Sequence, residues 1–506
     1  MNILKILISV TTILTLLTGL RVLEPINKAH TSLQNTTTTK KQDDSKLISQ
    51  KQLVIKFKDE LNLPYEDGIE KQIQTEKKDI VLENIFLTYP QLTLTRLFTS
   101  VTPKEIDNLK KNKKSFLKTY ANLMSYYIVT VPNKMAINML LEKFKKSSII
   151  EQAYITEKVE SKPPEIQISS ESLNPLNNPR FEKQGYLKEA PYGIDAMYAW
   201  SINGGDGTGI TFADMEYGWF LEHEDLINQK VELLSGLNRT TDFRHGTSVL
   251  GIVSAEDNTV GNIGIAPKAT PKVISQIRND GSYNTADAVL YAVNKLHSGD
   301  VLLLEAQTNY EGYAPTIWFP VELQPGVFDA IRAGIDKGIT IIEAGGNGAQ
   351  DLDHFTDITG KQILNRNCPD FKDSGAIIVG ASTSTVPHIR LHPSNYGSRI
   401  DVYGWGEDVD TLDIKVVSNL NNSSIPVITS AYTSKFNGTS SASPIIAGAA
   451  ASIQGIVKAN QGIPYSPEEL RRILSNPNTG TQSEDPLIDK IGVLPDLKAI
   501  ISQLKL

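Results

Sequence analysis

Short apolar runs alternate with amphipathic stretches along the C-terminal part of the chain. The runs are largely aliphatic, which is typical of strands that are buried on both faces of a parallel sheet. Amphipathic stretches such as Ala286–His297 and Gly326–Lys337 separate them and predict crossover helices. The pattern predicts a doubly wound, mostly parallel α/β fold with its functional site at the carboxyl ends of the strands. The predicted strands are Gly209–Ala213, Val273–Ile277, Val301–Leu304, Ile339–Ala344 and Ala376–Gly380.

A second hydrophobic pattern occupies residues 52–160. Leu53–Phe57 and Tyr126–Val131 are rich in β-branched and aromatic residues, which favours strands. Apolar residues recur at helical spacing within Met135–Ser147, and Ile149–Ile155 resembles a further strand. These elements predict a small α+β domain ahead of the α/β domain.

The first residues have the layout of an export signal. Lys5 precedes the short apolar run Ile6–Leu17, so we expect residues 1–29 to be a signal peptide or, if uncleaved, a signal anchor. The expected location is secreted or periplasmic, with membrane anchoring as the alternative. Residues 30–51 are dominated by Ser, Thr, Asn, Gln and Lys, which is typical of a disordered linker.

Residues 161–178 form a second connector, which is rich in proline and serine and begins Ser161-Lys162-Pro163-Pro164. Segments of this composition commonly separate domains and are exposed to cleavage. We therefore place a domain boundary here, between the α+β domain and the α/β domain of residues 179–506.

Glycine and small polar residues lead into a long run of small apolar residues around Ser440. The segment Gly438–Pro444 is followed by Ile445–Ala451, which indicates a loop entering a buried helix. A serine at a helix N-terminus lies beside free N–H groups that can stabilise an oxyanion. Ser440 is therefore a candidate nucleophile, and the alternative is a serine and threonine cluster that caps a core helix.

A nucleophilic serine needs a histidine base, and the histidine needs a carboxylate that orients it. Among the seven histidines, His245 stands just before a small, apolar, helix-like run. The predicted strand that begins at Gly209 closes on Asp214, and Glu216-Tyr217-Gly218 is expected to turn away from it. The sequence thus predicts Asp214, His245 and Ser440 as a catalytic set.

These motifs resemble those of the subtilisin-type serine endopeptidases. Gly438–Pro444 is similar to the nucleophile motif of that family, His245–Thr247 to its histidine motif, and Asp214 to its strand-end acid. A fourth block, Gly338–Gly348, is similar to the segment that carries the family's oxyanion asparagine, which here is Asn347. The order of acid, histidine and serine is also the family's order.

The resemblance implies a serine endopeptidase that hydrolyses peptide bonds in protein or peptide substrates. Ser440 would be the nucleophile, His245 the general base and then acid, Asp214 the orienting carboxylate, and Asn347 an oxyanion donor. It also implies that residues 52–160 are a pro-domain that assists folding and inhibits the enzyme, with the maturation site in residues 161–178. The alternative is a catalytically silent member of the family that binds peptides.

Substrate contacts are expected from two segments at strand ends. The resemblance places Leu304, Glu305 and Ala306 where the family has a strand edge that pairs with the substrate backbone, and this edge departs from the usual Ser-x-Gly pattern. Glu305 is either a pocket acid that favours a basic or small substrate side chain, or a member of a structural ion pair, and we favour the second reading. The second of the two expected substrate-binding segments comprises Ala344, Gly345 and Gly346.

No cofactor is expected for the chemistry, whereas structural calcium is possible. Asp225 and Asn258 match positions that supply side-chain oxygens to Ca²⁺ in many members of the family. A formal net charge of −7 without a basic patch argues against a nucleic-acid partner. A membrane is an expected partner only if the N-terminal segment stays uncleaved, and the single cysteine, Cys368, excludes an intramolecular disulfide.

Overall fold

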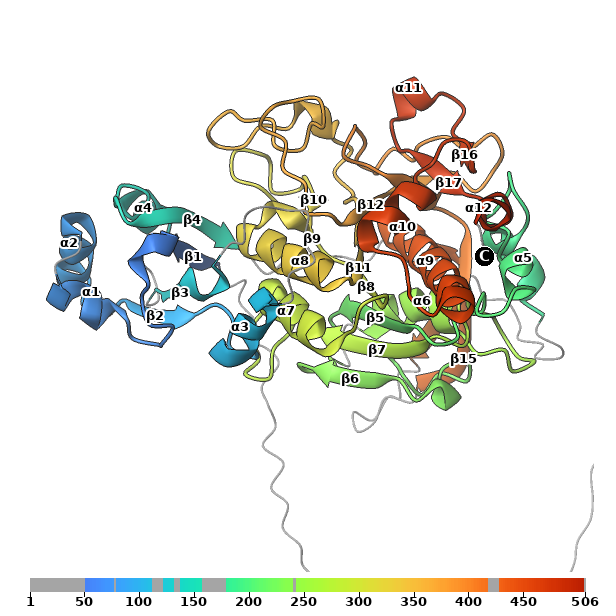
Figure 1. Cartoon of the computed structure of the whole chain (residues 1–506), viewed down its shortest axis with the longest axis horizontal. Helices are drawn as coiled ribbons and strands as arrows, with labels where there is room; N and C mark the ends of the chain where they lie inside the picture. The colour runs from blue at the N-terminus through green and yellow to red at the C-terminus, as the bar shows by residue number, and fades with distance from the viewer. Residues whose placement is uncertain are drawn as a thin grey trace, which may run out of the picture. The chain divides into compact units, whose positions relative to one another are not determined.

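A computed structural model of the chain describes residues 51–76, 79–111, 122–131, 137–156, 179–239, 243–416 and 427–504 (Figure 1). The expected signal segment 1–29, all but the last residue of the expected linker 30–51, and the connector 161–178 lie outside these residues. We call residues 52–156 the N-terminal domain and residues 179–504 the C-terminal domain.

The N-terminal domain contains a four-stranded antiparallel sheet with the strand order β2-β3-β1-β4. One of the two central strands, β1 (Gln52–Phe57), is buried from Leu53 to Phe57, so both of its faces are covered. The strands are β1 (Gln52–Phe57), β2 (Thr93–Arg96), β3 (Tyr126–Thr130) and β4 (Ile150–Thr156), and the helices are α1 (Glu70–Glu76), α2 (Ile80–Thr88), α3 (Pro103–Lys111) and α4 (Ile137–Phe144).

The C-terminal domain is built on a nine-stranded sheet with the order β16-β17-β13-β12-β11-β8-β5-β7-β6. Every pairing in it is parallel except that of β16 with β17. The predicted mostly parallel α/β fold is confirmed. The strands are β5 (Thr211–Glu216), β6 (Glu232–Ser235), β7 (Thr270–Ser275), β8 (Val301–Leu304), β11 (Thr340–Ala344), β12 (Ile377–Ser382), β13 (Val402–Trp405), β16 (Gly480–Gln482) and β17 (Val493–Pro495).

Helices cover this sheet, and the pairs α7 with α8 and α6 with α9 pack together. Helix α9 contacts β8, β11, β12 and β13, because its alanine and glycine residues allow close approach to the sheet. The helices are α5 (Ala196–Trp200), α6 (Phe243–Ser254), α7 (Thr285–Lys295), α8 (Pro325–Lys337), α9 (Thr439–Gln461), α10 (Pro467–Leu474), α11 (Pro486–Asp489) and α12 (Leu497–Gln503).

Among the described residues, α9 is the one helix whose length and composition would allow it to cross a membrane, and 94% of its apolar window is buried inside the protein. The burial identifies α9 as the core helix of the C-terminal domain.

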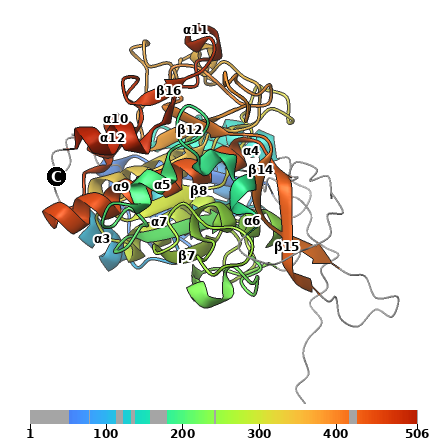
Figure 2. The same ribbon diagram turned by 90° about the vertical axis from the view of Figure 1, so that its right-hand side faces the viewer.

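Two antiparallel pairs of strands lie outside the nine-stranded sheet. The hairpin of β14 (Val409–Val416) and β15 (Val427–Phe436) leads directly into α9 (Figure 2). The second pair joins β9 (Gln307–Thr308) to β10 (Phe319–Pro320), just after the end of β8. Residues 309–318 form a loop between these two strands, and the rings of Tyr313 and Phe319 pack against Phe355.

Candidate active site

Ser440 is the second residue of α9, at the helix N-terminus that the sequence predicts. The preceding Gly438 has φ +81°, a left-handed conformation that favours glycine, and this residue turns the chain from β15 into the helix. Ser440 is half-buried. Its backbone N–H belongs to the first turn of α9, where N–H groups have no partner within the helix.

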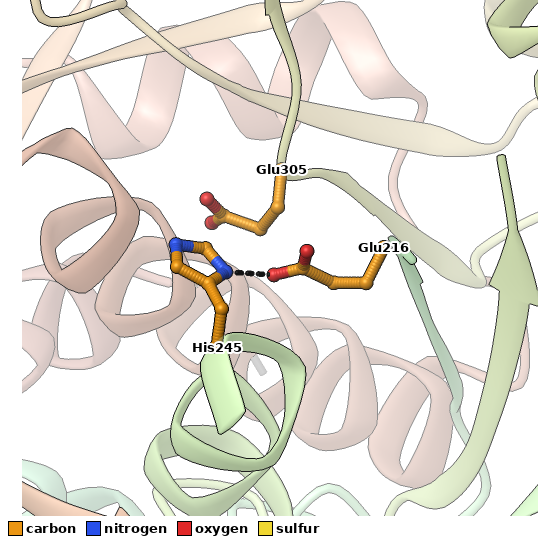
Figure 3. A group of neighbouring side chains, drawn as sticks. All are labelled: Glu216, His245 and Glu305. Atoms are coloured by element: carbon orange, nitrogen blue, oxygen red, sulfur yellow. Dashed lines mark hydrogen bonds and ion pairs between the residues drawn. The ribbon is translucent and has the colours of Figure 1, made fainter. Parts of the chain in front are cut away.

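His245 lies near the start of α6, and its imidazole contacts a glutamate. The Nδ1 atom of His245 forms a short contact with Oε1 of Glu216, the last residue of β5 (Figure 3). The side chain of Glu216 is only 2% exposed, so this pair is shielded from water. The ring of Phe436 packs edge-on against the imidazole, with its centroid 5.4 Å away. His245 is thus fixed by one carboxylate and one aromatic ring.

The structure does not bring Asp214 to His245, and the predicted partner is corrected to Glu216. The Oδ2 atom of Asp214 accepts a hydrogen bond from the indole Nε1 of Trp219 at 2.7 Å. Its Oδ1 atom is buried and has no partner among the described residues. Burial, reinforced by the negative charge of Glu216, raises the pKa of Asp214 well above its usual range. Asp214 is therefore a buried group within the sheet, and its surroundings favour the neutral acid.

The length of β5 explains this correction. The strand runs two residues beyond Asp214 and ends at Glu216, so the chain does not turn away where the sequence predicts. Residues two apart in a strand point to the same face and are separated by about 7 Å along it. Glu216 therefore reaches the carboxyl edge of the sheet, while Asp214 remains inside it.

Glu305 follows β8 directly and places a second carboxyl group beside the imidazole (Figure 3). One side-chain atom from each of Glu216, His245 and Glu305 lies within 4.8 Å of the others. The Oε1 atom of Glu305 forms a short contact with Ser443 Oγ, and its Oε2 atom is buried without a partner among the described residues. The expected structural ion pair is replaced by this contact with a serine.

The protonation state of Glu305 follows from its surroundings. Burial, followed by repulsion from Glu216, raises the pKa of Glu305 well above its usual range. Ser443 Oγ also lies 2.7 Å from the carbonyl oxygen of Thr439, and a hydroxyl group has only one proton to donate. With Glu305 ionised, Ser443 would have to divide its one proton between Glu305 and Thr439, whereas a protonated Glu305 could donate to Ser443 and leave that proton for Thr439, so the two contacts favour the neutral acid.

His245 is also shifted by burial. Desolvation, the largest cause, lowers the pKa of the imidazole. A lowered pKa favours the neutral imidazole, which is the form that can accept a proton from a hydroxyl group.

Ser440 and His245 line one small cavity of about 20 Å³ at the carboxyl ends of β5, β8 and β11. The cavity also brings together residues from both predicted substrate segments. Its full lining is Tyr217, His245, Glu305, Ala306, Gln307, Ala344, Thr439 and Ser440.

Asn347 lies next to the start of α9. Its Oδ1 atom accepts hydrogen bonds from the backbone N–H of Thr439 at 3.0 Å and from Thr439 Oγ1 at 3.2 Å. These bonds fix the orientation of the amide and use its acceptor. The Nδ2 group, which carries the two donors, has no partner among the described residues.

The remaining predicted substrate residues line the ends of two adjacent strands. Leu304 ends β8 and Ala344 ends β11, and these strands pair in parallel. Ala306, Gly345 and Gly346 are buried just beyond them. Gln307 is a site residue that the sequence does not predict, because the family pattern describes this strand edge by its backbone pairing with the substrate and not by its side chains.

Asp225 is the stronger of the two predicted calcium ligands. Its Oδ2 atom accepts the backbone N–H of Asn262 at 2.9 Å, while Oδ1 is buried without a partner among the described residues. Burial raises the pKa of Asp225 to about 7. Asn262 Oδ1 is likewise buried without a described partner, whereas Asn258 Oδ1 accepts the N–H of Val260 at 3.0 Å. Two unsatisfied buried oxygens fit the hard oxygen ligands that Ca²⁺ prefers.

The chain belongs to the subtilase family, whose family model matches residues 234–490, half of the chain. This is a family of serine-type endopeptidases whose catalysis needs no cofactor. The matched segment contains His245, Asn347 and Ser440. Neither Asp214 nor Glu216 lies within it, so the choice of acid depends on the structure.

Similar proteins include several proteases. Subtilisin-like protease 1 of Pseudogymnoascus destructans is 24% identical over 262 residues, 50% of this chain and 54% of that protein, so the chain spans about half of that relative. Subtilisin DY of Bacillus licheniformis is 28% identical over 271 residues, 52% of this chain and 84% of that protein. A calcium-dependent protease of Trichormus variabilis is 27% identical over 299 residues, 54% and 43% of the two chains.

Solved structures that resemble the chain include fervidolysin from Fervidobacterium pennivorans, described as a keratinolytic enzyme related to subtilisin. It is 16% identical, has a TM-score of 0.48, and the match covers 80% of this chain and 60% of that one. A cold-adapted subtilisin-like serine proteinase is 18% identical, with a TM-score of 0.39 and coverage of 57% and 88%.

Proposed function

We propose that this chain hydrolyses peptide bonds in proteins through a triad of Ser440, His245 and Glu216. The observation that carries the proposal is the buried contact between His245 and Glu216, with His245 and Ser440 lining one cavity. Glu216 thus has the role of the carboxylate that orients His245, which the sequence predicts for Asp214.

The first step is the attack of Ser440 Oγ on the carbonyl carbon of the scissile bond. The hydroxyl proton passes to Nε2 of His245, and the Nδ1–H group of the imidazolium donates to Glu216. The oxyanion receives hydrogen bonds from the Asn347 amide and from the Ser440 N–H at the start of α9. Collapse of the intermediate breaks the C–N bond, and His245 gives its proton to the departing amine.

Water then enters in place of the amine. His245 takes a proton from this water as its oxygen attacks the ester carbonyl, and it returns the proton to Ser440 as the acyl group leaves. The enzyme ends in its starting state. A neutral Glu305 adds no second negative charge beside Glu216, so the imidazolium that forms in each step is balanced by one carboxylate.

We further propose that the N-terminal domain is a pro-domain of an exported zymogen. Its support is the contact with α7, where buried Asp287 accepts the backbone N–H groups of Thr99 at 2.8 Å and Ser100 at 2.9 Å. The side chains of Ser100 and Asp287 also form a short contact, and Arg278 donates to Asp287 at 2.8 Å.

Helix α8 provides a second attachment. Tyr126 OH donates to Asp329 Oδ2 at 2.5 Å, and Tyr154 OH accepts the backbone N–H of Gly326 at 3.1 Å. Asp287 and Gly326 lie in the first turns of α7 and α8, and a crossover helix begins at the carboxyl edge of the sheet. The N-terminal domain thus binds toward the edge that carries Ser440.

Calcium is proposed as a structural ligand, with Asp225 and Asn262 as side-chain donors and Asn258 in the loop between them. The similarity to a calcium-dependent protease supports this proposal. When bound, the ion would neutralise the buried Asp225 carboxylate and tie this loop to the turn that follows β5.

The experiment is mass spectrometry of the purified full chain and of Ser440→Ala after incubation with a protein substrate such as casein. We expect substrate fragments, and loss of the N-terminal domain, only with Ser440 intact. Ser502→Ala, which changes an exposed serine on α12, is the matched control and should behave like the natural chain. Equal cleavage by Ser440→Ala would overturn the proposal.

A further inference from the structure

The two substrate-binding segments leave the sheet side by side, because β8 and β11 are neighbouring parallel strands. Beyond β8 the chain continues through Ala306 and Gln307, and beyond β11 through Gly345 and Gly346 to Asn347. A substrate side chain next to the scissile carbonyl would have to enter between these segments, since Ser440 lies at their shared end.

Gln307 joins the two segments. Its Oε1 atom accepts a hydrogen bond from the backbone N–H of Asn347 at 3.1 Å. The side chain therefore spans the space between the end of β8 and the end of β11. The side chain of Asn347 accepts a hydrogen bond from the Thr439 N–H. The bond between Gln307 and the Asn347 N–H therefore connects Gln307 to the start of α9.

The loop between β9 and β10 closes the same space from another direction. It returns as β10, which pairs with β9 so that Pro320 lies opposite Gln307. The Trp318 carbonyl oxygen is so close to Gly348 that a Cβ atom there would lie 2.2 Å from it. Asn395 Nδ2 donates to this oxygen at 2.7 Å and to the Gly345 carbonyl oxygen at 2.8 Å. These two bonds hold the loop against the segment that follows β11.

Little room is left beside the nucleophile. The cavity between Gln307, Ala344 and Ser440 has a volume of about 20 Å³, enough for about one water molecule. A methyl group is of comparable size, whereas the side chains of leucine and phenylalanine are several times larger.

We propose that Gln307 is a specificity-determining residue that closes the pocket for the side chain next to the scissile carbonyl, so that the enzyme cleaves after glycine and alanine. The inference rests on the proposed peptidase function and adds its substrate class. Glu305 lies in the same cavity, but its carboxyl group is engaged with Ser443.

The test is a cleavage-site survey of the full chain on a mixed peptide library, read by mass spectrometry, with Ser440→Ala to remove background cuts. We expect cleavage after alanine or glycine to be at least about tenfold more efficient than after leucine or phenylalanine. Gln307→Ala should reduce that ratio by about tenfold or more, because it removes the bridge and frees its volume. Gln482→Ala, on the exposed edge strand β16, should leave the ratio unchanged.

Each ratio compares two substrates in one preparation, so it does not depend on how much of a variant is folded. Ser440-dependent cleavage after large residues by the natural chain would refute the specificity and leave the peptidase function standing. An unchanged ratio in an active Gln307→Ala variant would also refute it. Absence of any Ser440-dependent cut, with or without the N-terminal domain, would refute the proposed function and this inference with it.

Discussion

Asp214 and Glu216 lie two residues apart on β5, and only Glu216 contacts His245. Asp214 instead accepts the indole proton of Trp219 at 2.7 Å. Two acids on one face of a strand thus have different tasks, because one is inside the sheet and the other is at its edge. The paired variants Glu216→Gln and Asp214→Asn separate these tasks.

Glu216→Gln should lower kcat by about three to four orders of magnitude, because an amide cannot balance the charge of the imidazolium. Asp214→Asn should keep kcat within about tenfold, since burial already favours the neutral form of Asp214 and the amide oxygen can still accept from Trp219. Steady-state kinetics on one peptide measures both. The reverse order of effects would restore Asp214 as the triad acid.

The pH profile of kcat/KM should reflect the shifted histidine. His245 must be neutral to act as a base, and burial lowers its pKa, so activity should persist below the pH at which an exposed histidine of pKa about 6.5 is protonated. An acid limb centred above about pH 7 would contradict this.

The same profile tests the protonation of Glu305. Because burial beside Glu216 raises the pKa of Glu305 and favours its neutral form, Glu305→Gln should leave the acid limb in place, and its amide can still donate to Ser443. Glu305→Ala should lower activity by removing the group that fills this space. If Glu305→Gln moved the acid limb to lower pH by about one unit, Glu305 would be ionised in the natural enzyme.

Asp287→Ala should weaken the attachment of the N-terminal domain. The change removes the acceptor for the Thr99 and Ser100 N–H groups and leaves Arg278 without its carboxylate. We expect the inhibition constant of the cleaved N-terminal domain, measured with both parts of the matured protein in solution, to rise by about tenfold or more. Asp370→Ala, at an exposed site, should have no such effect. An unaltered inhibition constant for Asp287→Ala would argue against this interface.

Calcium should stabilise the folded protein through Asp225. Saturating Ca²⁺ is expected to raise Tm by a few degrees, because a ligand at about 100 times its Kd contributes about 2.7 kcal/mol. Asp225→Asn should lose most of this shift, whereas Asp370→Ala should retain it. Differential scanning fluorimetry in EDTA and in CaCl₂ provides the measurement, and an equal shift in Asp225→Asn would exclude this site.

Much of the fold could be predicted because its signals are local. The apolar runs at Val301–Leu304 and near Ile339–Ala344 are strands, and the small residues after Ser440 form the core helix α9. The acid was harder to assign, since strand ends are the least certain feature of a sequence pattern. The sequence does contain a cue for the acid, because Gly218 follows Glu216 by two residues and indicates a turn just after it. In the structure, a Cβ atom at Gly218 would lie 2.3 Å from the Arg239 carbonyl oxygen, which explains the glycine there.

Other features depend on contacts that no local pattern encodes. Gln307 becomes a bridge only because the chain beyond β11 places the Asn347 N–H within its reach. The pKa of Glu305 is raised only because the folded chain buries its carboxyl group beside Glu216. Such roles follow from segments far apart in the chain, and the structure is needed to see them.

Labelling with a fluorophosphonate tests the triad most directly, because the probe reacts preferentially with an activated serine. The labelled residue is located by peptide mass spectrometry in the natural chain, in Glu216→Gln and in Asp214→Asn. We predict phosphonylation of Ser440, slowed by at least about a hundredfold in Glu216→Gln and little changed in Asp214→Asn. A label on another residue, or labelling that depends on Asp214 and not on Glu216, would contradict the account.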